Sequence, residues 1–151
     1  MKRSLTITRD PIDESDLIQG RDLSSEAGAA ITFSGIVRGT EDAAAIDGIN
    51  YEAHEAMARH QFEKLFEAME TRWPIESIRL IHRIGPVRVS EPSLWVEVIA
   101  GHRGEAFAAC QWLIDEMKKK VPIWKHPMLP ESHRLRRSRS DPNPGSRPSR
   151  G

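Results

Sequence analysis

The stretch EAMARHQFEKLFEAMETRWP, residues 55–74, decides the fold. Its large and small apolar residues recur three or four positions apart and form a single stripe of Ala58, Phe62, Leu65, Phe66, Met69 and Trp73. Such a stripe predicts a helix over residues 55–73 that packs one face on a core. Pro74 ends this helix because proline disfavours helical geometry in the residue before it.

Segments with the alternation or the apolar content of β-strands lie on both sides of this helix. They cover residues 4–8, 29–37, 49–54, 77–84 and 94–100, with a short strand or turn at 87–92. A second long helix is predicted at 105–120, and Asp10-Pro11 predicts the start of a short helix that continues over 12–18. Residues 38–48 and the proline-stiffened segment after residue 120 are expected to be loops. Long helices between pairs of strands predict an α+β domain.

The composition excludes several classes of protein. The chain has 151 residues with 22 Lys and Arg against 22 Asp and Glu, and this neutral balance argues against a dedicated nucleic-acid binder. The single Cys allows no internal disulfide and no Cys-based zinc site, and the six His show no helical ligand spacing, so we expect no metal. Common nucleotide-binding signatures are absent, and we expect no cofactor. Without a membrane-spanning run or a signal peptide, a cytoplasmic protein is expected.

The C-terminal residues differ from the rest of the chain. Residues 132–151 carry six Arg and one Asp, a net charge of +5, so the preceding 131 residues carry −5. This segment is rich in Ser and Pro and has almost no large apolar side chain, so it cannot offset the entropy of ordering. We predict a folded domain over residues 1–135 and a disordered tail over 136–151. RNA binding is an alternative for the tail, but its composition favours a solvated extension.

Cationic residues gather at the ends of the predicted elements. Arg38 follows one strand, and His102-Arg103 stands between another strand and the second long helix, where backbone N–H groups favour an anion. Three lysines at 118–120 end that helix, and Lys125 follows soon after. Helical phase puts Phe107, Cys110, Ile114 and Met117 on one face, with either Lys118 or Lys120 partly buried at its border and Lys119 in solvent. Partial burial beside other cations lowers the pKa of a lysine and suits it to act as a base or nucleophile.

Six motifs in a fixed order resemble one enzyme family. They are FSGIVRG (33–39), YEAH (51–54), RWP (72–74), IHRIG (81–85), HRGEAF (102–107) and KKKVPIWKHP (118–127). Together they resemble the large, catalytic subunit of molybdopterin synthase over residues 28–131. The arginine-rich tail is not part of the pattern.

The resemblance implies a fold, an activity and partners. The implied fold is an α/β hammerhead domain with an additional antiparallel β subdomain. The implied reaction transfers sulfur to cyclic pyranopterin monophosphate and forms the dithiolene of molybdopterin. The sulfur comes from the C-terminal Gly-Gly thiocarboxylate of a small ubiquitin-like sulfur-carrier subunit. The large subunit is expected to be a homodimer within a heterotetramer, without membrane or nucleic acid.

The resemblance also implies roles for individual residues. It selects Lys118 over Lys120 and makes Lys118 and Lys125 the expected catalytic residues. The expected substrate-binding residues are Ile36, Val37, Arg38, His102, Arg103, Lys118, Lys125, His126 and Pro127, with His126 expected to contribute its backbone more than its side chain. His82 is interpreted as structural, and Tyr51 as a core or rim residue. The competing interpretation is a non-catalytic scaffold that binds the tail of a ubiquitin-like protein beside a sheet edge.

Overall fold

The computed structural model describes residues 1–130, so the predicted domain boundary at residue 135 and the predicted tail lie outside the described part of the chain. The strands are β1 (Lys2–Thr8), β2 (Ala29–Ile36), β3 (Thr40–Glu41), β4 (Ala44–Ala45), β5 (Gly48–Ala53), β6 (Ile75–Arg83), β7 (Gly85–Arg88), β8 (Pro92–Ala100) and β9 (Ile123–Met128), and the helices are α1 (Glu14–Gln19), α2 (Glu55–Arg72) and α3 (Arg103–Lys120).

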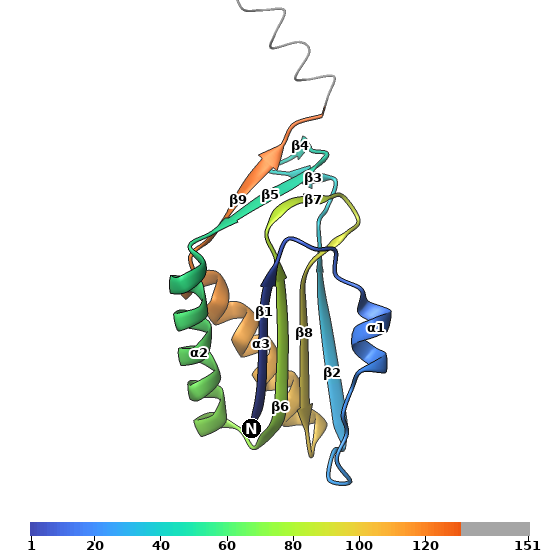
Figure 1. Ribbon diagram of the computed structural model, residues 1–151, viewed down its shortest axis with the longest axis vertical. Helices are drawn as coiled ribbons and strands as arrows, with labels where there is room; N and C mark the ends of the chain where they lie inside the picture. Colours follow the sequence, from blue (N-terminus) through green and yellow to red (C-terminus); the bar gives the residue numbers. More distant parts are fainter. Residues whose placement is uncertain (131–151) are drawn as a thin grey trace, which may run out of the picture.

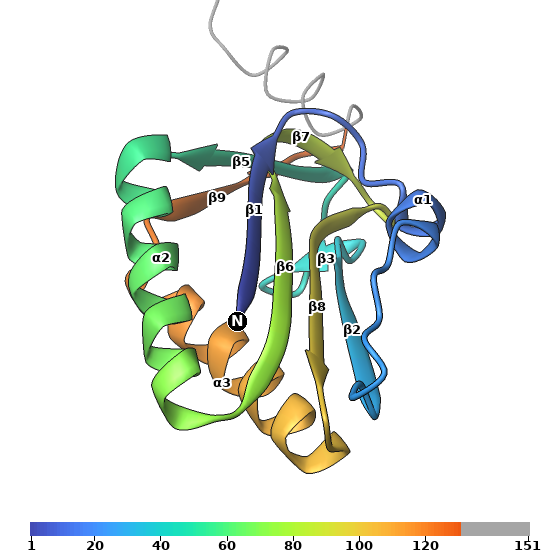
Figure 2. The same cartoon turned by 60° about the horizontal axis from the view of Figure 1, so that its bottom comes forward.

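The larger part of the molecule is a four-stranded sheet with two long helices. The strand order is β1-β6-β8-β2, with β1 parallel to β6 and the other two pairs antiparallel. Helices α2 and α3 lie together on one face of this sheet, while α1 lies beside β2 on the other side (Figures 1 and 2). This two-layer arrangement buries the apolar stripe of each long helix against the sheet.

A smaller sheet stands at one end of the four-stranded sheet. Its strand order is β7-β5-β9, all antiparallel, and the hairpin of β3 and β4 lies beside it (Figure 1). The chain therefore has the predicted α+β class, with an α/β hammerhead part and an additional antiparallel β subdomain. The junction between these two parts includes the ends of β2, β6 and α3. Arg38 lies just beyond the end of β2, Lys118 lies in the last turn of α3, and Lys125 lies within β9.

The packing of α2 confirms the stripe read from the sequence, whereas α3 differs from its prediction. In α2 the buried residues are Ala58, Phe62, Leu65, Phe66 and Met69. In α3 they are Ala106, Ala109, Cys110, Leu113 and Met117. Phe107 was predicted on the buried face but is 59% exposed. The helix is rotated so that its small Ala side chains meet the sheet, which allows close approach.

The structure differs from the sequence prediction in three segments: two that were expected to be loops, and the start of the short helix α1. Residues 123–128 form strand β9, because β5 offers a neighbouring edge with which they pair from Ala53↔Ile123 to Gly48↔Met128. The segment 38–48 contains the hairpin of β3 and β4, whose turn residues Asp42 and Ala43 have positive φ angles of 49° and 62°. Helix α1 is capped by Asp13, whose carboxylate accepts a hydrogen bond from the Asp16 amide at 3.1 Å, and not by Asp10.

Candidate active site

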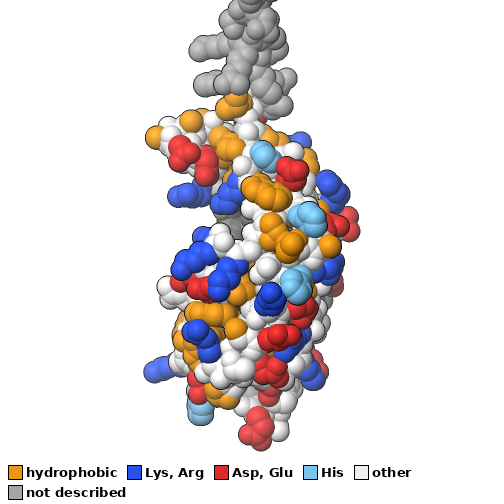
Figure 3. Space-filling view, turned by 90° about the vertical axis from the view of Figure 1, so that its left-hand side faces the viewer, with side chains coloured by type: hydrophobic (Ala, Val, Ile, Leu, Met, Phe, Trp, Pro, Cys, Tyr) orange, Lys and Arg blue, Asp and Glu red, His pale blue; other side chains and the backbone are white. Residues whose placement is uncertain are grey.

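A cavity of about 660 Å³ opens where the two sheets meet the end of α3. Its walls come from β2, β5, β6, β8, β9 and the last turn of α3, so segments from most of the described chain contribute to it. On the face seen in Figure 3, Lys and Arg side chains gather on either side of the indentation between the smaller sheet and the helical part. Its size suits a small heterocyclic ligand or the tail of a peptide.

Three cations from distant parts of the sequence line this cavity: Arg38, Lys118 and Lys125. Arg38 follows β2, Lys118 lies in the last turn of α3, and Lys125 lies in β9. No Asp or Glu side chain is among the described residues that line the cavity. Three positive charges without a neighbouring carboxylate in the wall favour a ligand that carries negative charge.

The structure distinguishes among the three lysines at the end of α3. Lys118 alone of the three lines the cavity, whereas Lys119 and Lys120 are paired with Glu116 at 3.7 Å and 3.0 Å. The expectation that Lys119 is solvated is confirmed, since its side chain is 70% exposed. The expected partial burial of Lys118 or Lys120 is wrong for the single chain, because both are exposed. Because the cavity is open to solvent, a bound ligand or partner would have to exclude water from Lys118.

Buried polar residues form the floor of the cavity. The Tyr51 hydroxyl donates to Ser93 Oγ at 3.1 Å, and the Ser93 hydroxyl lies 3.3 Å from the Gly35 carbonyl, which accepts from it. The His82 ring meets the Tyr51 ring edge-on at a centroid distance of 5.3 Å. Burial raises the pKa of Tyr51, so its phenol keeps its proton. These residues fix the shape and the polarity of the floor.

Tyr51, interpreted as a core or rim residue, and His82, interpreted as structural, both lie on the cavity wall. Both are buried, at 6% and 5% exposure, and both line the cavity. The available signal was the alternation in β6, where Ile78, Leu80 and His82 occupy successive inward positions. An imidazole in an otherwise apolar series marks the point where the core gives way to a polar site.

The remaining residues predicted near the strand ends are divided between the cavity and other surfaces. Ile36 lines the cavity, and its exposed fraction is 47%. Val37 is only 2% exposed, and its backbone forms hydrogen bonds with Ser90 and Glu91 next to the end of β2. His126 points to the opposite side of the smaller sheet from Lys125, because successive residues of a strand alternate.

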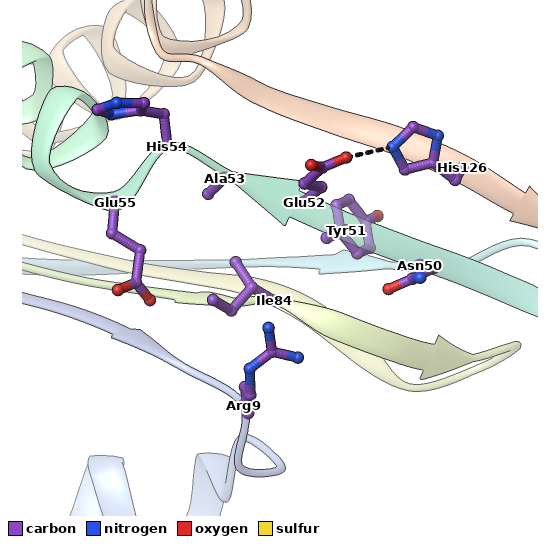
Figure 4. Close-up of a pocket in the computed structure, with 9 residues that line it drawn as sticks. All are labelled: Arg9, Asn50, Tyr51, Glu52, Ala53, His54, Glu55, Ile84 and His126. Carbon is purple, nitrogen blue, oxygen red and sulfur yellow. Dashed lines mark hydrogen bonds and ion pairs between the residues drawn. The ribbon is translucent and has the colours of Figure 1, made fainter.

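His126 lines a second, more open cavity of about 620 Å³ on the far side of β5. There its Nε2 atom pairs with the Glu52 carboxylate at 2.9 Å (Figure 4). Pro127 is exposed and pairs in register with Ile49. Neither side chain reaches the cationic cavity, and only their backbone supports it by holding β9 against β5.

His102 and Arg103 stand far from the other predicted residues in this chain. His102 caps the start of α3 and Arg103 is its first residue, whereas Lys118 lies in its last turn. Fifteen residues of helix separate Arg103 from Lys118, a distance of about 22 Å along the axis. One chain therefore does not bring His102 and Arg103 to the cavity that contains Lys118.

Residues 1–130 show no metal site, no reactive cysteine and no membrane-spanning helix. No group of three or more His, Cys, Asp or Glu residues in this range could hold a metal ion. Cys110 is 5% exposed, and burial raises the pKa of its thiol to about 11, which confirms it as a core residue. None of the helices in this range is long and apolar enough to cross a membrane.

The fold and the cavity define an α+β protein with a cationic, carboxylate-free site for a small anionic ligand. The sequence profile of the family described as MoaE protein matches residues 7–120. A molybdopterin synthase catalytic subunit from Thermoplasma volcanium is 38% identical over 123 residues, which are 82% of this chain and 89% of that protein.

Solved structures agree with the sequence relatives. Molybdopterin synthase from Staphylococcus aureus has a TM-score of 0.76 at 27% identity and covers 83% of this chain and 91% of its own. A chain in the protein–protein complex of subunits 1 and 2 of the molybdopterin-converting factor from Helicobacter pylori has a TM-score of 0.71 at 26% identity, covering 83% of this chain and 84% of its own.

The chain belongs to the MoaE family, whose curated relatives are molybdopterin synthase catalytic subunits. The family predicted from the six motifs is thereby confirmed. So is its class as an enzyme of molybdenum cofactor biosynthesis.

Proposed function

We propose that this chain transfers sulfur from the C-terminal thiocarboxylate of a small ubiquitin-like carrier subunit to cyclic pyranopterin monophosphate. The product is the dithiolene of molybdopterin. The observation that carries the proposal is that Arg38, Lys118 and Lys125 line one cavity without a carboxylate in a chain of this family. Both reactants are anionic, and the charge of the cavity suits each of them.

The cations would act in two ways. The guanidinium of Arg38 presents donors in a fork that matches the oxygens of a cyclic phosphate. Lys118 is the acid–base group at the carbon that receives sulfur. Alternatively, once the carrier is joined to the pterin through its sulfur, the neutral Lys118 amine attacks the acyl carbonyl, the acyl C–S bond breaks, and the sulfur stays on the pterin as a thiolate. Lys125 stabilises negative charge that develops on the thiocarboxylate or on a ring oxygen. Ile36 lies against the ligand, while Val37, His126 and Pro127 contribute through the backbone that positions Arg38 and Lys125.

The carrier tail would also bury the Lys118 and Lys125 side chains, which are exposed to solvent in the single chain. Lys118 and Lys125 are both exposed in the open cavity. An extended Gly-Gly tail is narrow enough to enter it and to exclude water around both ammonium groups. Removal of water strengthens their electrostatic interaction with the reacting atoms. The structurally similar Helicobacter pylori chain comes from a complex of two subunits, which supports such a partner here.

A role for His102 and Arg103 in substrate binding requires a second copy of the chain. These residues lie at the far end of α3 from Lys118. We propose a homodimer in which each copy brings this pair to the cavity of the other, with one carrier subunit bound to each copy. The heterotetramer would work in the cytoplasm, without a cofactor and without nucleic acid.

Reconstitution tests the proposed function. Purified chain is mixed with thiocarboxylated carrier and cyclic pyranopterin monophosphate, and molybdopterin is measured after oxidation to its fluorescent derivative. Conversion in proportion to the thiocarboxylate supplied is the expected result. A chain that binds the carrier tail but yields no dithiolene would be a scaffold, and the proposal would be wrong.

A further inference from the structure

His82 brings a polar atom to the floor of the cationic cavity. The preceding inward positions of its strand are occupied by apolar side chains. Ile78 and Leu80 precede it on the inward face of β6, and both are fully buried. His82 itself is 5% exposed and lines the cavity. Burying most of an imidazole here in place of an aliphatic residue costs desolvation energy, and among the described residues only Arg83 Nε, not a His82 ring nitrogen, is both fully buried and unpaired.

Only one of the two ring nitrogens is satisfied within residues 1–130. His82 Nδ1 lies 2.8 Å from the carbonyl oxygen of Arg83. A carbonyl only accepts, so Nδ1 carries the proton in this bond, and Nε2 is left with a lone pair. Nε2 has no hydrogen-bond partner in the described part of the chain. The ring therefore presents an unused acceptor.

The surroundings keep this acceptor neutral. Burial, with a smaller contribution from the positive charge of Lys125, outweighs the bond to the Arg83 carbonyl and lowers the pKa of His82 from 6.5 to about 4. At neutral pH the imidazole is uncharged. It adds no fourth positive charge to Arg38, Lys118 and Lys125.

The hydroxyl protons of the cavity wall are already engaged, although the oxygens keep lone pairs. The Tyr51 proton is donated to Ser93, and the Ser93 proton to the Gly35 carbonyl. The Ser34 hydroxyl is bonded to the Glu14 carboxylate. Among the described side chains of the wall, His82 Nε2 is thus a free acceptor among cationic donors.

We propose that His82 Nε2 accepts a hydrogen bond from an N–H or O–H group on the uncharged heterocyclic part of the substrate. The cations hold the anionic part of the same molecule. This inference rests on the proposed function, because it assigns the atom that recognises the heterocycle of that substrate. It makes His82 a substrate-binding residue that distinguishes a phosphorylated heterocycle from a phosphate alone.

Two amide variants separate the roles of the ring nitrogens. His82→Asn places an amide near Nδ1 and retains a donor for the Arg83 carbonyl, but it leaves no acceptor at Nε2. His82→Gln places an amide near Nε2 and can restore the acceptor. Binding of cyclic pyranopterin monophosphate to the full chain is measured by calorimetry, with inorganic pyrophosphate as the anionic probe that lacks the heterocycle. Thermal unfolding identifies variants that fold.

The expected result is a loss of about tenfold in affinity for the pterin in His82→Asn, the effect of one hydrogen bond to a buried acceptor. Pyrophosphate affinity should stay the same, and His82→Gln should recover most of the pterin affinity. Equal pterin affinity in His82→Asn and the unmodified chain would overturn the inference, and so would a parallel loss for both ligands. If His82→Asn does not fold, His82→Met takes its place with the same expected losses. Failure of the unmodified chain to bind the pterin would instead overturn the proposed function, and this inference with it.

Discussion

Glu97 is a carboxylate in the middle of β8 and is only 1% exposed. Two arginines compensate it: Arg79 Nε lies 2.8 Å from one of its oxygens, and Arg21 Nε lies 2.7 Å from the other. Burial by itself raises the pKa of Glu97, but the hydrogen bonds from Arg79 and Arg21 outweigh burial and lower the pKa below its usual value. The Arg79 guanidinium also lies 4.9 Å from the centre of the Trp95 ring. This cluster ties the segment after α1 to the sheet.

Replacing Glu97 by Ala should destabilise the fold by about 3 kcal/mol, because two partly buried guanidinium groups lose their partner. Urea unfolding measures the change. Asp22→Asn is the matched control, since Asp22 pairs with Lys2 at 3.2 Å but both side chains are at least 80% exposed. The control should leave the unfolding midpoint unchanged. Equal midpoints for Glu97→Ala and the unmodified chain would show that the cluster contributes nothing.

His82 makes stability depend on pH in a defined window. Its pKa is lowered from 6.5 to about 4, chiefly by burial. Between these values the unfolded chain binds a proton that the folded chain does not, so stability is greatest above pH 6.5 and falls as the pH decreases. The slope is at most about 1.4 kcal/mol per pH unit. Urea unfolding at pH 7 and pH 5 should show a smaller decrease for His82→Gln than for the unmodified chain, and the same decrease in both would contradict this assignment.

Strand β9 determines which of two neighbouring side chains, Lys125 or His126, faces the cavity. Alternation along the strand directs Lys125 toward the cavity and His126 toward Glu52 on the other side. Lys125→Ala should therefore lower the rate of dithiolene formation by about 100-fold. His126→Ala should change that rate by less than about threefold, because it removes only an exposed ion pair. Single-turnover rates compare the two variants, and a larger loss in His126→Ala would contradict the strand register.

The long elements could be predicted from the sequence, while the short ones depend on their partners. The stripe in α2 is repeated over five turns, so local pattern suffices to define it. The turn between β3 and β4 has Ala43 at a positive φ of 62°, where a glycine would have been the usual signal. Strand β9 contains Pro127 and follows no clear alternation of apolar residues. It forms because β5 has a free edge with which it can pair. The presence of that edge cannot be inferred from the local sequence of residues 123–128.

The candidate site, too, could be predicted from the sequence only in part. Helical phase left Lys118 and Lys120 as alternatives, and only the family resemblance selected Lys118. The floor residues Tyr51 and His82 carry no charge and lie in buried strands, so the only local signal was the imidazole of His82 in the otherwise apolar inward series of β6. The separation of Arg103 from Lys118 follows from the helix predicted over 105–120, whereas the location of the cavity at the Lys118 end depends on the packing of distant strands.

At the scale of the whole molecule, the separation of Arg103 from Lys118 predicts complementation between damaged chains. Arg103→Ala and Lys118→Ala chains are each expected to be poorly active. In a dimer with one chain of each kind, one of the two cavities combines an intact lysine with an intact arginine. A randomly assorted equal mixture should therefore regain about a quarter of the unmodified activity. Activity no higher than the mean of the separate variants would contradict sharing of the site between copies.

We propose above all that the Lys118 amine carries out chemistry in the cavity formed between the two sheets and the end of α3. Single-turnover formation of molybdopterin is the direct measurement, with thiocarboxylated carrier in excess and Lys119→Ala as the control. Lys119 is the neighbouring lysine and lies outside the cavity wall. We expect that Lys118→Ala folds normally but loses at least about 100-fold in rate, while Lys119→Ala keeps the unmodified rate. Near-normal turnover by Lys118→Ala would contradict this proposal.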